Sequence, residues 1–113
     1  MEIIRESLTL QALKEMAVAL FGDMVKAVVD VDRERMAVNA ELHSDLEALL
    51  LEDGSKQASL WGINLYPELQ GGDFLEFDSM INVRPSQNNS SRGVVDPLIR
   101  EKIIDIVARK VRR

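Results

Sequence analysis

The sequence predicts a small α+β protein, in which an antiparallel sheet of about four strands carries helices packed on one face. Three segments have apolar residues at helical spacing, and two pairs of segments alternate apolar and polar residues as β-hairpins do. The order along the chain is α-β-β-α-β-β-α. Because hairpin strands pair antiparallel, one face of the sheet is expected to meet the helices and the other to face water.

The composition fits one globular domain covering residues 1–113, since 46% of the residues are apolar and the length suffices for a core without cross-links. The absence of cysteine excludes disulfides, thiolate metal sites and a cysteine nucleophile. A net charge of −5 disfavours nucleic acid as a partner. No apolar run is long enough to cross a membrane and the first residues do not resemble a signal peptide, so we expect a cytoplasmic protein.

The first predicted helix lies within residues 9–23. Thr9 or Ser7 can cap its start, and Gly22 suits the left-handed conformation that often ends a helix. Its predicted apolar face consists of Leu10, Leu13, Val18, Leu20 and Phe21.

Residues 25–42 predict a hairpin with its tip at Arg33-Glu34, because this register places the apolar residues of both strands on one face. Val29 then lies opposite Val38. Opposite charges also face each other on the other side, in the pairs Asp32 with Arg35 and Lys26 with Glu41.

The second half of the chain begins with a short helix over residues 44–54, where Ser44 and Glu47 have the spacing of a capping box. Residues 61–66 and 74–84 alternate as two further strands. The last helix starts at Pro97 with Asp96 as its cap. Its predicted apolar face consists of Leu98, Ile99, Ile103, Ile106 and Val107.

Polar residues on the water-facing side of the sheet suggest one candidate catalytic group. His43 lies between Glu41 and Asp45 in the sequence, and a neutral histidine near carboxylates can act as a general base. Glu76 and Asp78 point the same way from one strand, so with Asp45 they could hold Mg²⁺ for hydrolysis. A histidine in this position more often hydrogen-bonds the backbone of a loop, and such carboxylates more often belong to a solvated sheet face. Both alternatives stay open. The candidate catalytic residues are His43, Asp45, Glu76 and Asp78, and the sequence assigns no resident metal and no cofactor.

The polar segment at residues 84–92, RPSQNNSSR, is the candidate ligand-binding loop. Arg84 and Arg92 offer forked donors that suit a carboxylate or phosphate. The candidate ligand-binding residues are Arg84, Ser86, Gln87, Asn88 and Arg92. We expect an ordered loop, because a strand pins one end and a helix the other, with Arg84 pointing outward. The alternative, that these side chains satisfy the backbone of the loop itself, stays open.

Three blocks of the sequence carry a resemblance to a known family: GDMVKAVVD, ELHSDLEALLLEDGSKQASLWGINLYP and EFDSMINVRPSQNNSSRGVVDPLIREKI. They are similar to a family of small prokaryotic proteins classified only as a domain of unknown function. The similarity covers nearly the whole chain. It implies one compact unit and brings no activity with it.

The functional hypotheses from the sequence are therefore three. The leading one is a non-catalytic binding module for an anionic small molecule or an acidic group. A metal-assisted hydrolase that uses the histidine and carboxylate group is the first alternative, so the sequence leaves open whether the protein is an enzyme. A structural homo-oligomer, such as a homodimer, is the second, with Val28, Phe74 and Met80 as outward residues of its interface.

Overall fold

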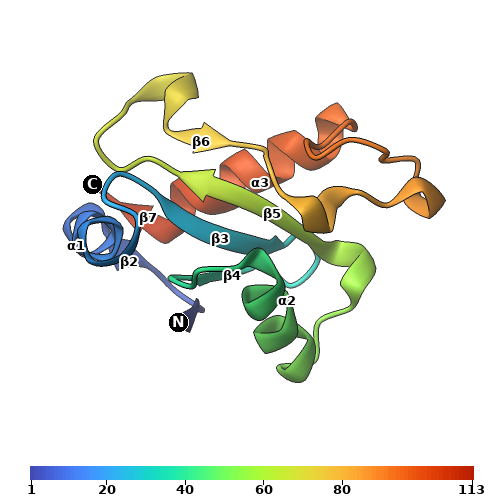
Figure 1. The fold of residues 1–113 in the computed structure, drawn as a ribbon, viewed down its shortest axis with the longest axis horizontal. Coiled ribbons are helices and arrows are strands. Elements are labelled where there is room, and N and C mark those ends of the chain that lie inside the picture. Colours follow the sequence, from blue (N-terminus) through green and yellow to red (C-terminus); the bar gives the residue numbers. More distant parts are fainter.

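In the computed structural model, which describes residues 1–113, an antiparallel sheet of five strands crosses the centre of the molecule with helices on both of its faces (Figure 1). The strand order is β1-β4-β3-β5-β6, and a separate parallel pair joins β2 to β7. The α+β class and the antiparallel sheet are confirmed. The elements are β1 (Glu2–Ile4), β2 (Leu8–Thr9), α1 (Leu10–Leu20), β3 (Val25–Asp30), β4 (Arg35–Val38), α2 (His43–Glu52), β5 (Leu60–Leu65), β6 (Leu75–Glu76), α3 (Pro97–Lys110) and β7 (Val111–Arg112).

The hairpin of β3 and β4 keeps the predicted faces but not the predicted register. Val29 pairs with Met36 instead of Val38, a shift of two residues. Such a shift leaves every side chain on the same face because strands repeat every two residues. The cause is the turn, which is longer than two residues: Asp30 Oδ1 accepts from the backbone N–H groups of Asp32 and Arg33, both at 2.9 Å.

The larger core lies between the sheet and two helices, α1 and α3, which cover one face. It includes Trp61 and Ile63 of β5, Leu13 of α1 and Ile103 of α3, and all four are almost fully buried. Figure 1 shows α3 passing behind the sheet while α1 is seen almost end-on. This arrangement matches the predicted packing of the first and last helices on the same face.

The second helix is the exception, because α2 packs on the opposite face. Leu46 and Leu50 of α2 form a second core with Val28, Ala37 and Leu60 of the sheet. The prediction that all helices share one face is therefore wrong for α2. The sequence of β3 does indicate a second covered face, because Val28 and Val29 are adjacent apolar residues, as expected of a strand buried on both faces.

The same packing removes most of the predicted dimer interface. Val28 is fully buried beneath α2, and Phe74 is buried in the larger core. Met80 alone of the three is exposed, at 65%.

The predicted caps of two helices are confirmed. Thr9 Oγ1 accepts from the backbone N–H of Ala12 at 3.0 Å, and Asp96 Oδ1 accepts from that of Leu98 at 2.8 Å. Gly22 follows α1 with a φ of +97°. The buried faces of these helices are narrower than predicted, since Val18 and Leu98 are mostly exposed.

The longest helix, α3, has 14 residues, and no helix is long and apolar enough to span a membrane.

Asp53, at the end of α2, joins three parts of the chain that are distant in sequence. Its carboxylate accepts from Arg5 at 2.7 Å, from Arg33 at 3.0 Å and from Arg35 at 2.9 Å. These donors, Arg5 above all, hold the pKa of Asp53 at about 2. The carboxylate thereby fixes the C-terminal end of α2 to the hairpin tip and to the segment after β1.

Replacement of Asp53 by asparagine is expected to lower the urea midpoint of unfolding at pH 7. Since the pKa of Asp53 is about 2 in the folded chain and about 3.9 when unfolded, its contribution is complete above pH ~4. That contribution is lost as the pH falls toward 2, so wild type and Asp53→Asn should converge over this range. Urea unfolding at pH 7, 4 and 2 measures this, with the exposed Glu52→Gln as the control. A gap that persists unchanged down to pH 2 would contradict the assignment.

Candidate functional site

A cleft of about 480 Å³ opens on the α2 face of the sheet, next to the N-terminus of α2. We call it the α2 cleft. Its floor is formed by β3 and β5, and its walls by α2 on one side and by β6 and the residues after it on the other. The lining residues are Met24, Lys26, Leu42, His43, Ser44, Asn64, Tyr66, Glu76, Asp78, Ser79, Met80, Ile81 and Arg92.

The cleft exists because α2 covers only part of this face. Val28 and Leu60 meet the helix, whereas further along the same face the strands carry the paired residues Lys26 and Asn64. The helix begins at His43 and does not reach over them. This strip is polar, as predicted, but it is not freely exposed to water, because Asn64 is buried and Lys26 is half-buried.

One wall of the cleft follows an edge of β5 that lacks a neighbouring strand. The predicted strand over residues 74–84 is wrong beyond Glu76, because the chain forms a 3₁₀ turn at Met80–Asn82. The side-chain amide of Asn82 takes the place of a strand there. Its Oδ1 accepts from the backbone N–H of Gly62 at 2.8 Å, and its Nδ2 donates to the Gly62 carbonyl at 2.9 Å.

Arg84 continues this replacement further along β5. Its guanidinium donates to the main-chain carbonyls of Leu60, Gln57 and Ile81 and lies 4.8 Å from the ring centroid of Trp61. Only 10% of the side chain is exposed. The prediction that Arg84 points outward is wrong, because the strand alternation on which it depended ends before this residue.

The rest of the loop is ordered, as predicted, and most of its amides bond to main chain. Asn89 donates to three carbonyls, among them that of Asn82 at 2.7 Å, and accepts from the N–H of Val95 at 2.8 Å. Gln87 donates to the carbonyl of Ala58 at 3.1 Å. The hydrogen bonds thus favour the structural alternative for the inner part of the loop.

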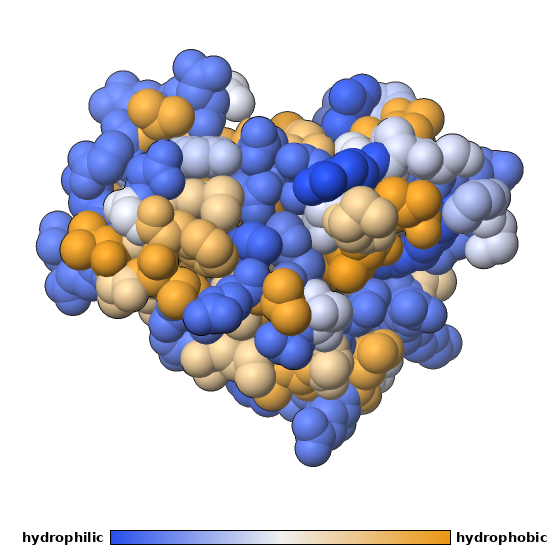
Figure 2. All heavy atoms as spheres, in the orientation of Figure 1, coloured by the Kyte–Doolittle hydropathy of each residue, from blue (hydrophilic) through white to orange (hydrophobic).

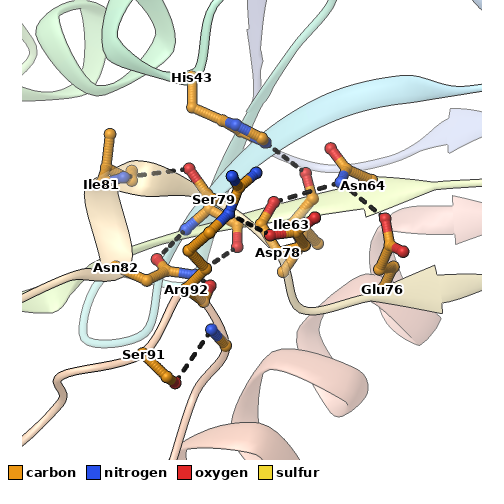
Figure 3. Close-up of polar contacts among 12 residues, drawn as sticks. His43, Ile63, Asn64, Glu76, Asp78, Ser79, Ile81, Asn82, Ser91 and Arg92 are labelled. Atoms are coloured by element: carbon orange, nitrogen blue, oxygen red, sulfur yellow. Dashed lines mark hydrogen bonds and ion pairs between the residues drawn. The ribbon is translucent and has the colours of Figure 1, made fainter.

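His43 anchors the start of α2 to the sheet. Its Nε2 lies 2.8 Å from the carbonyl oxygen of Ile63, so in the neutral ring Nε2 carries the proton and Nδ1 the lone pair. Burial lowers the pKa of His43, which favours this neutral form at pH 7. Figure 3 shows the ring pointing from α2 toward Ile63 and Asn64 of β5.

The expected capping box of α2 is absent. Leu42 occupies the N-cap position, and no side chain bonds the first turn, because the helix begins one residue before Ser44. The first-turn N–H groups at the rim of the cleft therefore have no side-chain acceptor.

Glu76 is the centre of the acidic side of the cleft. Its Oε1 accepts from Asn64 Nδ2 at 2.9 Å and from the Tyr66 hydroxyl at 3.0 Å. Asn64 Nδ2 also donates to the Asp78 carbonyl at 3.2 Å, so both of its N–H groups are used. Asn64 Oδ1 is buried and has no hydrogen-bond partner. Burial, followed by the bond to Glu76, raises the pKa of Tyr66, which keeps the hydroxyl protonated as a donor.

Two cations complete the site. Arg92 donates through Nε to Asp78 Oδ1 at 2.7 Å, and its terminal nitrogens make no hydrogen bond within the chain. Lys26 lies 5.3 Å from the ring centroid of Phe21 and has no carboxylate within 4.0 Å. Both side chains therefore have unused donors beside the cleft.

The cleft unites residues from both groups that the sequence singled out. His43, Glu76, Asp78 and Arg92 line it, whereas the remaining candidates do not. No three His, Cys, Asp or Glu side chains lie close enough together to hold a metal ion. Lys26, Asn64 and Tyr66 also line the cleft, although the sequence did not assign them to a site. The candidates outside the cleft are Asp45, Arg84, Ser86, Gln87 and Asn88.

Fold and cleft together define a class: a small α+β protein with a mixed-charge cleft between a helix N-terminus and a sheet. The family model described as "Protein of unknown function (DUF5674)" matches residues 2–110, so the chain belongs to that family. The resemblance seen in the sequence is thereby confirmed. No curated protein and no solved structure matches the chain.

Replacement of Gly62 by alanine is expected to lower the free energy of unfolding by about 1–3 kcal/mol, the usual cost of overpacking. A Cβ at position 62 would lie 2.5 Å from Ser79 Cβ and would push residues 79–82 off the edge of β5. Urea unfolding measures the loss, and hydrogen exchange of the backbone amide at position 62 reports whether its bond to Asn82 has opened. Gly72→Ala is the matched control, because a Cβ at position 72 would have no atom within 4 Å. Equal stability of the two variants would contradict this packing.

Proposed function

We propose that the protein is a cytoplasmic, non-catalytic binding module for a small molecule with an acidic group, and that this group binds in the α2 cleft. The observation that carries the proposal is the presence of two cations with unused donors, Lys26 and Arg92, at one cleft. The proposal keeps the ligand class that the sequence suggested. It moves the site from the polar loop to the cleft, where only Arg92 of the loop contributes.

The two cations suit different parts of an acidic group. The Nε bond to Asp78 orients the Arg92 guanidinium and leaves its forked end available to a carboxylate or phosphate. Lys26 contributes a compact charge on a flexible stem, which adapts to a ligand more readily. A charge-assisted bond from either is stronger than a neutral hydrogen bond.

The N-terminus of α2 adds to the attraction. Its first-turn N–H groups have no side-chain acceptor and carry the positive end of the helix dipole. Leu42, His43 and Ser44 place this end of the helix on the cleft lining. Because His43 is held neutral there, it does not add a third charge to the cleft at pH 7.

Binding is proposed over the two alternatives for specific reasons. The hydrolase hypothesis requires Asp45 in the site and a group of ligands for Mg²⁺, but Asp45 lies outside the cleft and no such group forms. The oligomer hypothesis relied on Val28 and Phe74, which are buried. On the face drawn in Figure 2, hydrophobic residues form several separate groups among hydrophilic ones.

Titration of the ¹⁵N-labelled protein with succinate and with phosphate, at low ionic strength, tests the proposal. We expect saturable shifts of the amide signals of Lys26, His43, Asn64 and Arg92. Lys26→Ala and Arg92→Ala should each weaken binding about three- to tenfold, since both side chains are partly exposed and screened.

Arg100→Ala is the matched control, because Arg100 is exposed on α3 and forms no ion pair. It should bind both anions as wild type does. The proposal fails if neither anion shifts these signals, or if Arg100→Ala weakens binding as much as the two cleft variants.

A further inference from the structure

We propose that the ligand of the α2 cleft is a small ampholyte of the aminocarboxylic acid type, whose amino group binds at Asn64 and Glu76 while its acidic group meets Lys26 and Arg92. This inference depends on the proposed function and adds the second half of the ligand. It is carried by a buried acceptor that no group of the chain satisfies.

That acceptor is Asn64 Oδ1. Asn64 is only 6% exposed, yet Oδ1 has no hydrogen-bond partner. The orientation of the amide is fixed by its other end, because Nδ2 donates to the Glu76 carboxylate and to the Asp78 carbonyl. A flipped amide would set its oxygen against these two acceptors. Oδ1 therefore points away from these two acceptors. Buried acceptors in proteins are normally hydrogen-bonded, so an unpaired one is unusual.

His43 is the neighbour that could supply a donor, and its own bonding prevents it. Asn64 lies close enough to favour the protonated form of His43. Burial has the larger effect and lowers the pKa of His43, so the ring is neutral with a single N–H. Nε2 uses that N–H for the carbonyl of Ile63 at 2.8 Å. No N–H of the ring is then left for Asn64 Oδ1, which has no hydrogen-bond partner within the chain.

An ammonium group fits this position better than a neutral donor. Glu76 Oε1 is 2.9 Å from Asn64 Nδ2, so a carboxylate contacts the same side-chain amide whose oxygen is unpaired. Glu76 Oε2 makes no hydrogen bond within the chain and can accept a second N–H. An ammonium has three N–H groups and a positive charge that the carboxylate balances.

The charges of the cleft support a ligand with both signs. Lys26 and Arg92 are balanced by Glu76 and Asp78, while His43 is neutral. A pure anion or a pure cation would leave one of these pairs without a counter-charge, whereas an ampholyte adds no net charge. A volume of about 480 Å³ lies at the small end of ligand sites, which suits a molecule of few heavy atoms.

The test compares glycine, β-alanine and 4-aminobutyrate with acetate, propionate and butyrate by isothermal titration calorimetry at pH 7.5 and low salt. Each aminocarboxylate and its partner differ by the amino group alone. At least one aminocarboxylate is expected to bind about tenfold tighter than its partner, the usual gain from a hydrogen bond to a charged group. The best chain length gives the separation of the two subsites.

The variants Asn64→Ala and Glu76→Gln then assign the gain. Both should bring the ratio of aminocarboxylate to carboxylate affinity toward one. Glu76 is exposed, so Glu76→Gln keeps the test valid if Asn64→Ala does not fold. Arg100→Ala should leave the ratio unchanged.

The outcomes separate the two proposals. If carboxylates bind and the amino group adds nothing, or if the gain survives Glu76→Gln, the ampholyte inference is overturned while the acidic-group proposal stands. If no compound of either series binds, the ampholyte inference fails, and the titration with succinate and phosphate alone decides the acidic-group proposal. Binding of aminocarboxylates with a gain that Asn64→Ala and Glu76→Gln abolish supports both.

Discussion

The unpaired edge of β5 is the constraint on which the rest of the site depends. All six residues of this strand are buried, and β6 pairs with only the last two of them. Backbone groups at a buried edge need hydrogen-bond partners, because the water that would satisfy them is excluded. Asn82 supplies these partners at Gly62, and Arg84 supplies one at Leu60. Side chains from an irregular segment thus complete the sheet where another protein would add a strand.

This solution explains why residues 81–92 are so rich in amides and arginine. The sequence predicted correctly that the segment is ordered, because its two ends are pinned. It assigned Arg84 to the surface because the alternation of residues 74–84 was extended through the turn at Met80–Asn82. A side chain that replaces a strand hydrogen bond looks, in sequence, the same as one that binds a ligand. Only the distances to Gly62 and Leu60 distinguish the two roles.

The parts of the fold that were predictable are those set by local chemistry. Thr9 and Asp96 cap their helices as expected, and the faces of β3 and β5 follow their alternation. The hairpin register was not predictable from pairing alone, because the Asp30 side chain organises a longer turn. The site was half predictable: His43 and the carboxylates were singled out, but their approach to Lys26 and Asn64 depends on where α2 crosses the sheet.

The cleft keeps its shape because α2 is fixed at both of its ends. The Asp53 carboxylate holds the C-terminal end through three arginines, and His43 holds the N-terminal end through the Ile63 carbonyl. Polar groups buried in a low dielectric stabilise a structure only when each of them is satisfied. The network at Asn64 has one unsatisfied member, the side-chain oxygen Oδ1. The proposed ligand would supply the missing donor at Asn64 Oδ1, and for this reason the proposal places the site in the α2 cleft rather than in the polar loop.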